Sequence, residues 1–228
     1  MPEVFSAEKA VKKVKKNVDV VVAEAKKMAA EMGRGNWLSS LWVLPNKVKF
    51  ETQNDKEVII LVVRRHIITN LWWLMLASFL VFIPWYWDSF PLIALVEEKV
   101  RFGLSLTWYL LLGFFVLEQL LLWYYNVYIV TDERIIDVDF FDLFHKNVDV
   151  AKIKSIEEVN YRQVGTMSIW FNYGNVVAQT ASEQRTSETG RELSAFTFEA
   201  VPNPDRIARV ISELIDQEEL ESYEGRVR

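Results

Sequence analysis

The sequence has no cysteine among its 228 residues and only two histidines, His66 and His145. A chain without cysteine has no disulfide framework, no thiolate nucleophile and no zinc–thiolate site. It also lacks a glycine-rich phosphate loop, a Gly-x-Ser-x-Gly motif and a His-Glu-x-x-His motif. The start of the chain is charged and has no short apolar core, so we expect no signal peptide. We therefore expect neither an enzyme nor a bound cofactor.

His145 lies three residues after Asp142 and four residues before Asp149. Such a grouping could serve acid–base catalysis or metal binding. A single histidine in a strand–loop region is far more often structural or solvent-exposed. We therefore assign no catalytic, cofactor-binding or metal-binding residue.

Charge is unevenly distributed along the chain, whose net charge is −5. Residues 1–65 carry 13 Lys and Arg against 8 Asp and Glu, whereas residues 126–228 carry 11 against 19. The C-terminal part thus has a net charge of −8. This balance disfavours nucleic acid and an anionic membrane surface as its partner.

Two long apolar runs dominate the middle of the sequence. Ile67–Trp87 holds 21 consecutive residues without a formal charge, and Phe102–Tyr128 is interrupted only by Glu118. A helix of 21 residues is about 31 Å long, close to the ~30 Å hydrocarbon core of a bilayer. The pattern predicts a transmembrane helical hairpin over residues 66–125, with spans at about 67–87 and 104–125.

Aromatic residues mark the ends of both predicted spans. Their amphipathic rings favour the headgroup level of a bilayer. The residues that we assign to this interface are Trp72, Trp73, Trp85, Tyr86, Trp87, Trp108, Tyr109, Trp123, Tyr124 and Tyr125. Seven Lys and Arg flank the hairpin on the side of the chain termini, against two in the inter-span loop 88–101. This distribution predicts a multi-pass protein of the cell (inner or plasma) membrane with both termini in the cytoplasm.

Three polar residues lie within the predicted spans: Asn70, Glu118 and Gln119. An intramembrane carboxylate can handle protons or ions. Asn70 and Glu118 reach similar depths in an antiparallel hairpin, so we favour a structural hydrogen bond between the helices. Two helices with one carboxylate are too few for a transport path unless the protein oligomerises.

The N-terminal segment, residues 1–35, carries apolar residues at heptad spacing. It could form an oligomerising coiled coil, or lie on the anionic inner leaflet as a basic amphipathic helix. The third interpretation is that it packs on the protein's own domain or stays largely disordered when isolated. The predicted seam includes Val11, Val14, Val18, Val21, Ala25, Met28 and Met32. The residues that could contact anionic lipid are Lys12, Lys13, Lys15 and Lys16.

Short strand-like runs begin after the second span. Residues 126–218 should form a mostly β domain of about seven strands that ends in one amphipathic helix. Asn203 is the expected N-cap of this helix and Pro204 its first-turn residue. The predicted strands are Val127–Thr131, Arg134–Val138, Val148–Ala151, Ile153–Val159, Ser168–Phe171, Val176–Gln179 and Leu193–Glu199. We expect turns at Asp132-Glu133 and Tyr173-Gly174-Asn175, and a loop over Ala181–Arg191.

The stretch Trp123–Ile136 resembles the opening of the bacterial pleckstrin-homology (PH)-like domain family, in which it follows a two-helix membrane hairpin. Residues 55–66 and Val201–Pro204 are similar to segments at the family's first span and last helix. The matching residues are Tyr128, Thr131, Asp132, Glu133, Arg134 and Pro204. The resemblance covers about residues 55–216 and implies a seven-stranded barrel or sandwich capped by a helix. Phosphoinositide binding at the first turn is disfavoured, because Asp132-Glu133-Arg134 stands there.

The expected organisation is therefore an N-terminal heptad helix, a short linking region, a membrane hairpin, a PH-like domain and a polar tail. Their ranges are 1–35, 36–65 (interfacial, with short β elements), 66–125, 126–218 and 219–228. We expect a non-enzymatic module at the cytoplasmic face that binds a protein or peptide partner through a sheet edge or groove. The alternatives are a lipid-sensing or membrane-organising protein and a homo-oligomeric scaffold. Fold alone does not decide among them.

Overall fold

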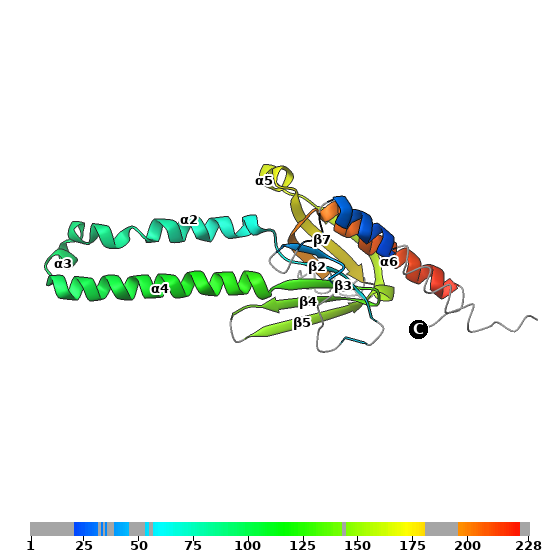
Figure 1. The fold of residues 1–228 in the computed structure, drawn as a ribbon, viewed down its shortest axis with the longest axis horizontal. Helices are drawn as coiled ribbons and strands as arrows, with labels where there is room; N and C mark the ends of the chain where they lie inside the picture. The colour runs from blue at the N-terminus through cyan, green and yellow to red at the C-terminus, as the bar shows by residue number, and fades with distance from the viewer. Residues whose placement is uncertain are drawn as a thin grey trace, which may run out of the picture.

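The computed structural model describes residues 21–31, 33, 35, 39–45, 53–54, 57–142, 145–180 and 196–223. These residues form a mixed β domain from which a long helical hairpin projects (Figure 1). The strands are β1 (Leu41–Val43), β2 (Ile59–Val63), β3 (Val127–Thr131), β4 (Arg134–Phe140), β5 (Lys146–Lys152), β6 (Ile156–Arg162), β7 (Tyr173–Thr180) and β8 (Phe196–Pro202). The helices are η1 (Ile67–Asn70), α2 (Leu71–Leu80), η2 (Ile83–Ser89), α3 (Pro91–Ala94), α4 (Glu98–Tyr125), η3 (Ile153–Ser155), α5 (Thr166–Trp170) and α6 (Pro204–Tyr223), with a further helix over residues 21–31.

The first sheet has five antiparallel strands in the order β1-β2-β3-β4-β5. Strand β2 pairs directly with β3, for example Val63 with Tyr128, although the whole hairpin separates them in the sequence. The hairpin is therefore an insertion between two neighbouring strands of one sheet. The short β elements expected within residues 36–65 are present, and they belong to the same sheet as residues 127–152.

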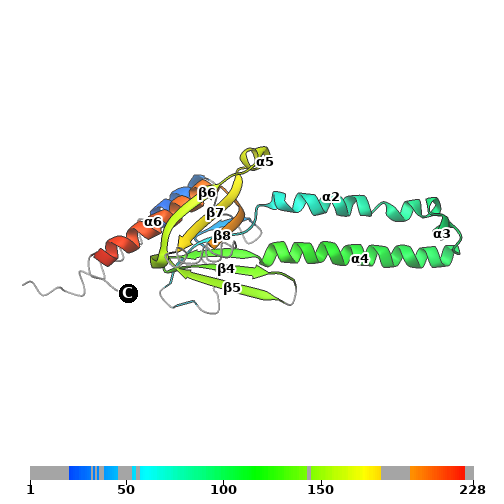
Figure 2. The ribbon, with the colours of Figure 1, turned by 180° about the vertical axis from the view of Figure 1, so that it is seen from behind.

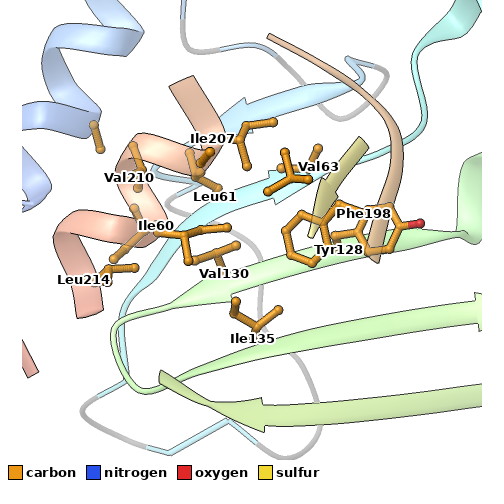
Figure 3. Close-up of a cluster of buried hydrophobic side chains, with 14 of the residues drawn as sticks. Ile60, Leu61, Val63, Tyr128, Val130, Ile135, Phe198, Ile207, Val210 and Leu214 are labelled. Carbon is orange, nitrogen blue, oxygen red and sulfur yellow. The ribbon is translucent and has the colours of Figure 1, made fainter. Parts of the chain in front are cut away.

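The second sheet has three antiparallel strands in the order β6-β7-β8. The two sheets are not joined by strand pairing within the described residues, so they do not close into a barrel. Their shared core contains the residues labelled in Figure 3: Ile60, Leu61, Val63, Tyr128, Val130, Ile135, Phe198, Ile207, Val210 and Leu214. Alternate residues of β3 enter this core because strand side chains point to opposite faces of a sheet. In β2 the register shifts between Ile59 and Leu61, so the adjacent residues Ile60 and Leu61 both enter it.

Helix α6 covers one end of the sheets, as expected for an amphipathic helix that must bury its stripe. The predicted stripe is confirmed, because Ile207, Val210, Ile211, Leu214 and Ile215 are all buried. The helix begins at Pro204, as expected. Asn203 has a positive φ of 49°, and its side chain accepts a hydrogen bond from Asn172.

The helix over residues 21–31 lies beside α6 (Figures 1 and 2). Val21, Ala25 and Met28 are buried in the main core, and Arg206 forms an ion pair with Glu31. Of the three interpretations of the heptad pattern, this part follows the third, packing on the protein's own domain. The seam positions Val11, Val14, Val18 and Met32 and the four lysines at 12–16 lie outside the described residues.

Two local predictions in the C-terminal part are wrong. Ser168–Phe171 was expected to be a strand and instead lies largely in helix α5, which follows Gly165 at φ 91°. Its β-favouring aromatic and branched side chains have no neighbouring strand to pack against. Tyr173-Gly174-Asn175 was expected to be a turn and instead starts β7. Gly174 allows close approach to β6, since a Cβ there would lie 2.6 Å from the Arg162 carbonyl oxygen.

The remaining strand predictions hold approximately. Strand β3 has the predicted bounds, and the turn at Asp132-Glu133 is held by Thr131, whose Oγ1 accepts from both Glu133 N and Arg134 N. The segment Ile153–Ser155 is a short 3-10 helix, so β6 starts three residues later than predicted. The loop expected at Ala181–Arg191 lies outside the described residues.

Helix α4 is 28 residues long, and none of its most apolar 18-residue window is buried, so it can cross a bilayer by length and composition. The first apolar run is not one straight helix. It bends by 40° between α2 and η2, and the two pieces qualify as a span only if they are counted together. Pro84, near the start of η2, explains the break because it has no N–H for the carbonyl of Leu80.

Candidate functional site

Helix α4 of the hairpin reinforces the bend in the first apolar run. The Nε1 of Trp108 donates to the Leu80 carbonyl (3.0 Å), and the hydroxyl of Tyr109 donates to the Val81 carbonyl (3.2 Å). Both carbonyls belong to the turn that Pro84 interrupts. Trp108 and Tyr109 were assigned to the membrane interface at the entry of the second span. Helix α4 begins at Glu98, six residues before the predicted span, so Trp108 and Tyr109 lie about three turns inside the helix, where both donate hydrogen bonds within the hairpin.

The polar residues of the hairpin do not pair as expected. Asn70 is buried and its Oδ1 accepts from Trp73 Nε1 (3.1 Å). Among the described residues, no hydrogen bond joins Asn70 to Glu118. Glu118 and Gln119 are half-buried on α4. Near the tip of the hairpin, Trp87 Nε1 donates to Ser105 Oγ (2.8 Å).

A buried arginine fixes the hairpin to the domain at its base. The Nε of Arg64 donates to the Tyr124 carbonyl (2.8 Å), and its Nη1 donates to the Ser39 carbonyl (3.2 Å). The guanidinium also lies over the Tyr124 ring, 4.7 Å from the centroid. Beside it, Trp123 Nε1 donates to the Arg65 carbonyl (2.9 Å). These contacts join the segment that follows β2 to the end of α4, at the base of the hairpin.

An acidic cluster lies on the core-facing side of the five-stranded sheet, at the end nearest the hairpin. Asp137 pairs across the ladder with Tyr128 on one side and Asp149 on the other. Asp139 follows two residues later on β4. Arg65 is near these acids and forms a 2.6 Å ion pair with Glu199 of β8. We call Asp137, Asp139, Asp149 and Glu199 the acidic cluster.

Burial and mutual repulsion shift the pKa values within the acidic cluster. Burial raises the pKa of Asp137 to about 7, and the charges of Asp139 and Asp149 add to this effect. The Oδ1 of Asp137 is buried and has no hydrogen-bond partner among the residues that the structure describes. Burial also raises the pKa of Asp139, which Arg65 partly offsets. Asp137 therefore changes charge near neutral pH.

Tyr128 connects the acidic cluster to the core. Its ring is buried and stacks on Phe198 with centroids 4.5 Å apart, and its hydroxyl accepts a hydrogen bond from Glu199 N. Burial raises the pKa of Tyr128 to about 12. Tyr128, one of the residues that carry the PH-like resemblance, is thus a neutral core residue that aligns β3 with β8.

The Asp132-Glu133 turn lies at the end of the sheet away from the hairpin (Figure 1). Arg134 forms a two-pronged ion pair with the buried Glu57, with both distances 2.9 Å. Burial alone would raise the pKa of Glu57, but hydrogen bonds from Arg134 and Thr131 hold it below its ordinary value. Arg134 therefore has a structural role, and it lies at the end of the sheet away from the hairpin.

Among the described residues, strand β5 pairs with β4 alone and forms an edge of the five-stranded sheet. Two hydrogen bonds lie at the ends of its pairing with β4. Phe141 N donates to the His145 carbonyl at one end, and Ile153 N donates to the Glu133 carbonyl at the other. Bonded and non-bonded pairs alternate along an antiparallel ladder. Residues 147, 149 and 151 therefore bond to β4. The N–H and C=O groups that point to the outer edge belong to Lys146, Val148, Val150 and Lys152.

The two faces of β5 differ in chemistry. Val148 and Val150 are 44% and 49% exposed and continue the apolar outer face formed by Val138 and Ile136. Asn147 and Asp149 lie on the opposite face, beside the acidic cluster. The edge thus offers an apolar side and an acidic side. The sequence did not predict this edge, because the strands at the edges of a sheet are known only once the order in which the strands pair is known.

The grouping around His145 is an exposed pair. His145 Nδ1 lies 2.7 Å from Asp142 Oδ2. In the described part of the chain, no group of three or more His, Asp or Glu residues is arranged to hold a metal ion. Comparisons with protein-family models, with curated proteins and with solved structures find no match to this chain.

Proposed function

We propose that this protein is a non-enzymatic, membrane-anchored module whose PH-like domain binds an extended peptide segment of a partner protein along β5. The helical hairpin is the anchor, and the domain and both termini lie on the cytoplasmic side. The observation that carries the binding proposal is the seven-residue β5 edge with its outward-pointing backbone groups.

The exposed surface of the hairpin supports the anchoring. Its apolar side chains face outward along the whole projection, including Trp72 at 80%, Phe79 at 70% and Leu110 at 66% exposure. Such a large continuous apolar surface is unfavourable in water. A buried core helix of a soluble protein would not be exposed in this way. The positive charge near residues 46–65 supports the orientation.

The chemistry of β5 indicates which peptide would fit. A strand added to this edge would form main-chain hydrogen bonds with residues 146, 148, 150 and 152. Its alternate side chains would contact Val148 and Val150 on one face and approach Asp149 on the other. We therefore expect a segment that alternates apolar residues with basic or polar ones. Lys146 and Lys152 lie at the two ends of β5. Their positive charges disfavour pairing of this edge with a strand that has basic ends, such as a second copy of β5.

Photo-crosslinking from the edge tests this proposal. A photoreactive amino acid replaces Val148 in the full chain, which is expressed and irradiated in cell membranes. We expect discrete adducts with a partner protein. The variant Val150→Pro removes an outward N–H without breaking the β4 ladder, so it should abolish these adducts. The matched variant Val150→Thr keeps the N–H and should retain them.

A probe at Ser212, an exposed position of α6, serves as the background control. Adducts that are equal at both sites, or that persist in Val150→Pro, would contradict binding at the edge. Adducts of the chain with itself alone would favour the homo-oligomeric scaffold instead.

A further inference from the structure

A second apolar surface lies on the loop that contains α5. Val164, Met167, Ile169, Trp170 and Phe171 are 75%, 60%, 64%, 83% and 47% exposed. No formal charge occurs from Gln163 to Thr180. We call residues 163–172 the α5 loop. A cluster of exposed large apolar side chains of this kind marks an interaction surface.

Hydrogen bonds of the polar residues hold the conformation of the α5 loop. Gln163 Nε2 donates to Asn172 Oδ1 (3.1 Å) and to the Tyr173 carbonyl (3.3 Å). Ser168 is buried and its Oγ donates to the Gly165 carbonyl (2.6 Å). Asn172 Nδ2 donates to Asn203 Oδ1 (2.8 Å), which connects the loop to the start of α6. The loop therefore presents its apolar residues in a fixed arrangement.

The α5 loop lies at the end of the domain from which the hairpin emerges, and both views show this (Figures 1 and 2). The ring of Tyr173, directly after the loop, stacks on His66 at the start of the hairpin, with centroids 5.5 Å apart. His66 N also donates to the Ala200 carbonyl of β8. A bilayer crossed by the hairpin would thus lie on the same side of the domain as the loop.

We propose that the α5 loop inserts its apolar side chains into the headgroup–acyl boundary of the leaflet that the hairpin enters. This inference rests on the proposed membrane anchoring. The lipid surface is the expected occupant because it would be continuous with the apolar surface of the hairpin. Trp170 has the amphipathic ring that favours this depth. Since the loop has no charge, its insertion should depend neither on anionic lipid nor on salt.

Depth-dependent quenching tests this proposal, and the absence of native cysteine allows single-site labelling. The full chain carries one cysteine, Met167→Cys, labelled with an environment-sensitive fluorophore and reconstituted in phosphatidylcholine vesicles. We expect a blue-shifted emission and at least threefold stronger quenching by spin-labelled lipid than for Leu220→Cys. Leu220 is an exposed position of α6, far from the hairpin. Adding anionic lipid or salt should leave the result unchanged.

A label at Leu117→Cys, two turns before the end of α4 at Tyr125, distinguishes the possible failures. Quenching at 117 without quenching at 167 would overturn the proposed insertion and leave the anchoring intact. No quenching at 117 would overturn the anchoring itself. In the Met167→Cys chain, Trp170→Asp should reduce the quenching at least threefold, whereas the matched Trp170→Phe should keep it. A blue shift that disappears at one copy per nanodisc would show that a second copy, not lipid, covers the loop.

Discussion

Asp137→Asn should stabilise the protein at neutral and alkaline pH, because it removes a charge that the fold disfavours. The carboxyl pairs across the sheet with Asp149, and its Oδ1 is buried without a hydrogen-bond partner in the described part of the chain. Burial raises its pKa to about 7, whereas an aspartate in an unfolded chain titrates near 4. Asparagine has nearly the same shape and no charge.

The pKa difference sets the size and the sign of the effect. The folded state binds more protons than the unfolded state between about pH 4 and pH 7, so wild-type stability falls as pH rises through this range. A pKa difference of this size between the folded and unfolded states corresponds to about 4 kcal/mol of folding free energy for a fully buried group. Asp137 is only partly buried, so we expect Asp137→Asn to raise the free energy of unfolding by half of this value, ~2 kcal/mol. The gain should be near zero at pH 4 and constant above about pH 7.

Urea unfolding of the full chain in detergent micelles, followed by tryptophan fluorescence from pH 4 to pH 9, measures this difference. Asp216→Asn, at an exposed carboxylate of α6, is the matched control and should change stability little at any pH. The reasoning is refuted if Asp137→Asn is less stable than wild type at pH 8. It is also refuted if the difference between the two proteins does not change with pH.

Three further substitutions test the structural contacts. Arg134→Ala leaves the buried Glu57 carboxylate without its guanidinium and should cost about 3 kcal/mol in urea unfolding at pH 7. This cost should shrink as pH falls through the acidic range, because without Arg134 burial raises the pKa of Glu57, and a protonated Glu57 no longer needs a partner charge. Arg64→Lys keeps the charge but loses the fork, so hydrogen exchange at residues 124–126 should become at least fivefold faster. Trp108→Phe leaves the Leu80 carbonyl without its indole donor and should destabilise the hairpin by about 1 kcal/mol in mixed-micelle unfolding.

The sequence predicted elements whose patterns are local. The stripe from Ile207 to Ile215, the turn at Asp132-Glu133 and the end of α4 at Tyr125 each follow from the pattern within one segment, whereas α4 starts six residues before the predicted residue 104. The helix at 166–170 was missed because its apolar residues favour a strand when neighbours are ignored. The bend of the first apolar run could have been inferred from Pro84, since proline interrupts a helix.

The candidate site was less predictable, because it depends on long-range pairing. Nothing local indicates that β2 and β3 are neighbours across the hairpin, or that β5 is an edge. The partners of Asp137 come from β3 and β5, so its raised pKa follows from the sheet register. The pair expected between Asn70 and Glu118 is not found among the described residues; the Oδ1 of Asn70 instead accepts a hydrogen bond from Trp73, three residues later in the chain.

We propose that the hairpin crosses a bilayer and leaves the domain on the cytoplasmic side, and accessibility to a labelling reagent tests this most directly. Single cysteines at Leu95, at the tip of the hairpin, and at Leu220, on α6, can be compared in intact cells with a membrane-impermeant maleimide. We expect residue 95 to be labelled in intact cells and residue 220 to be labelled only after permeabilisation. The protein should also resist carbonate extraction. Labelling of both positions from the same side, or release of the protein by carbonate, would contradict it.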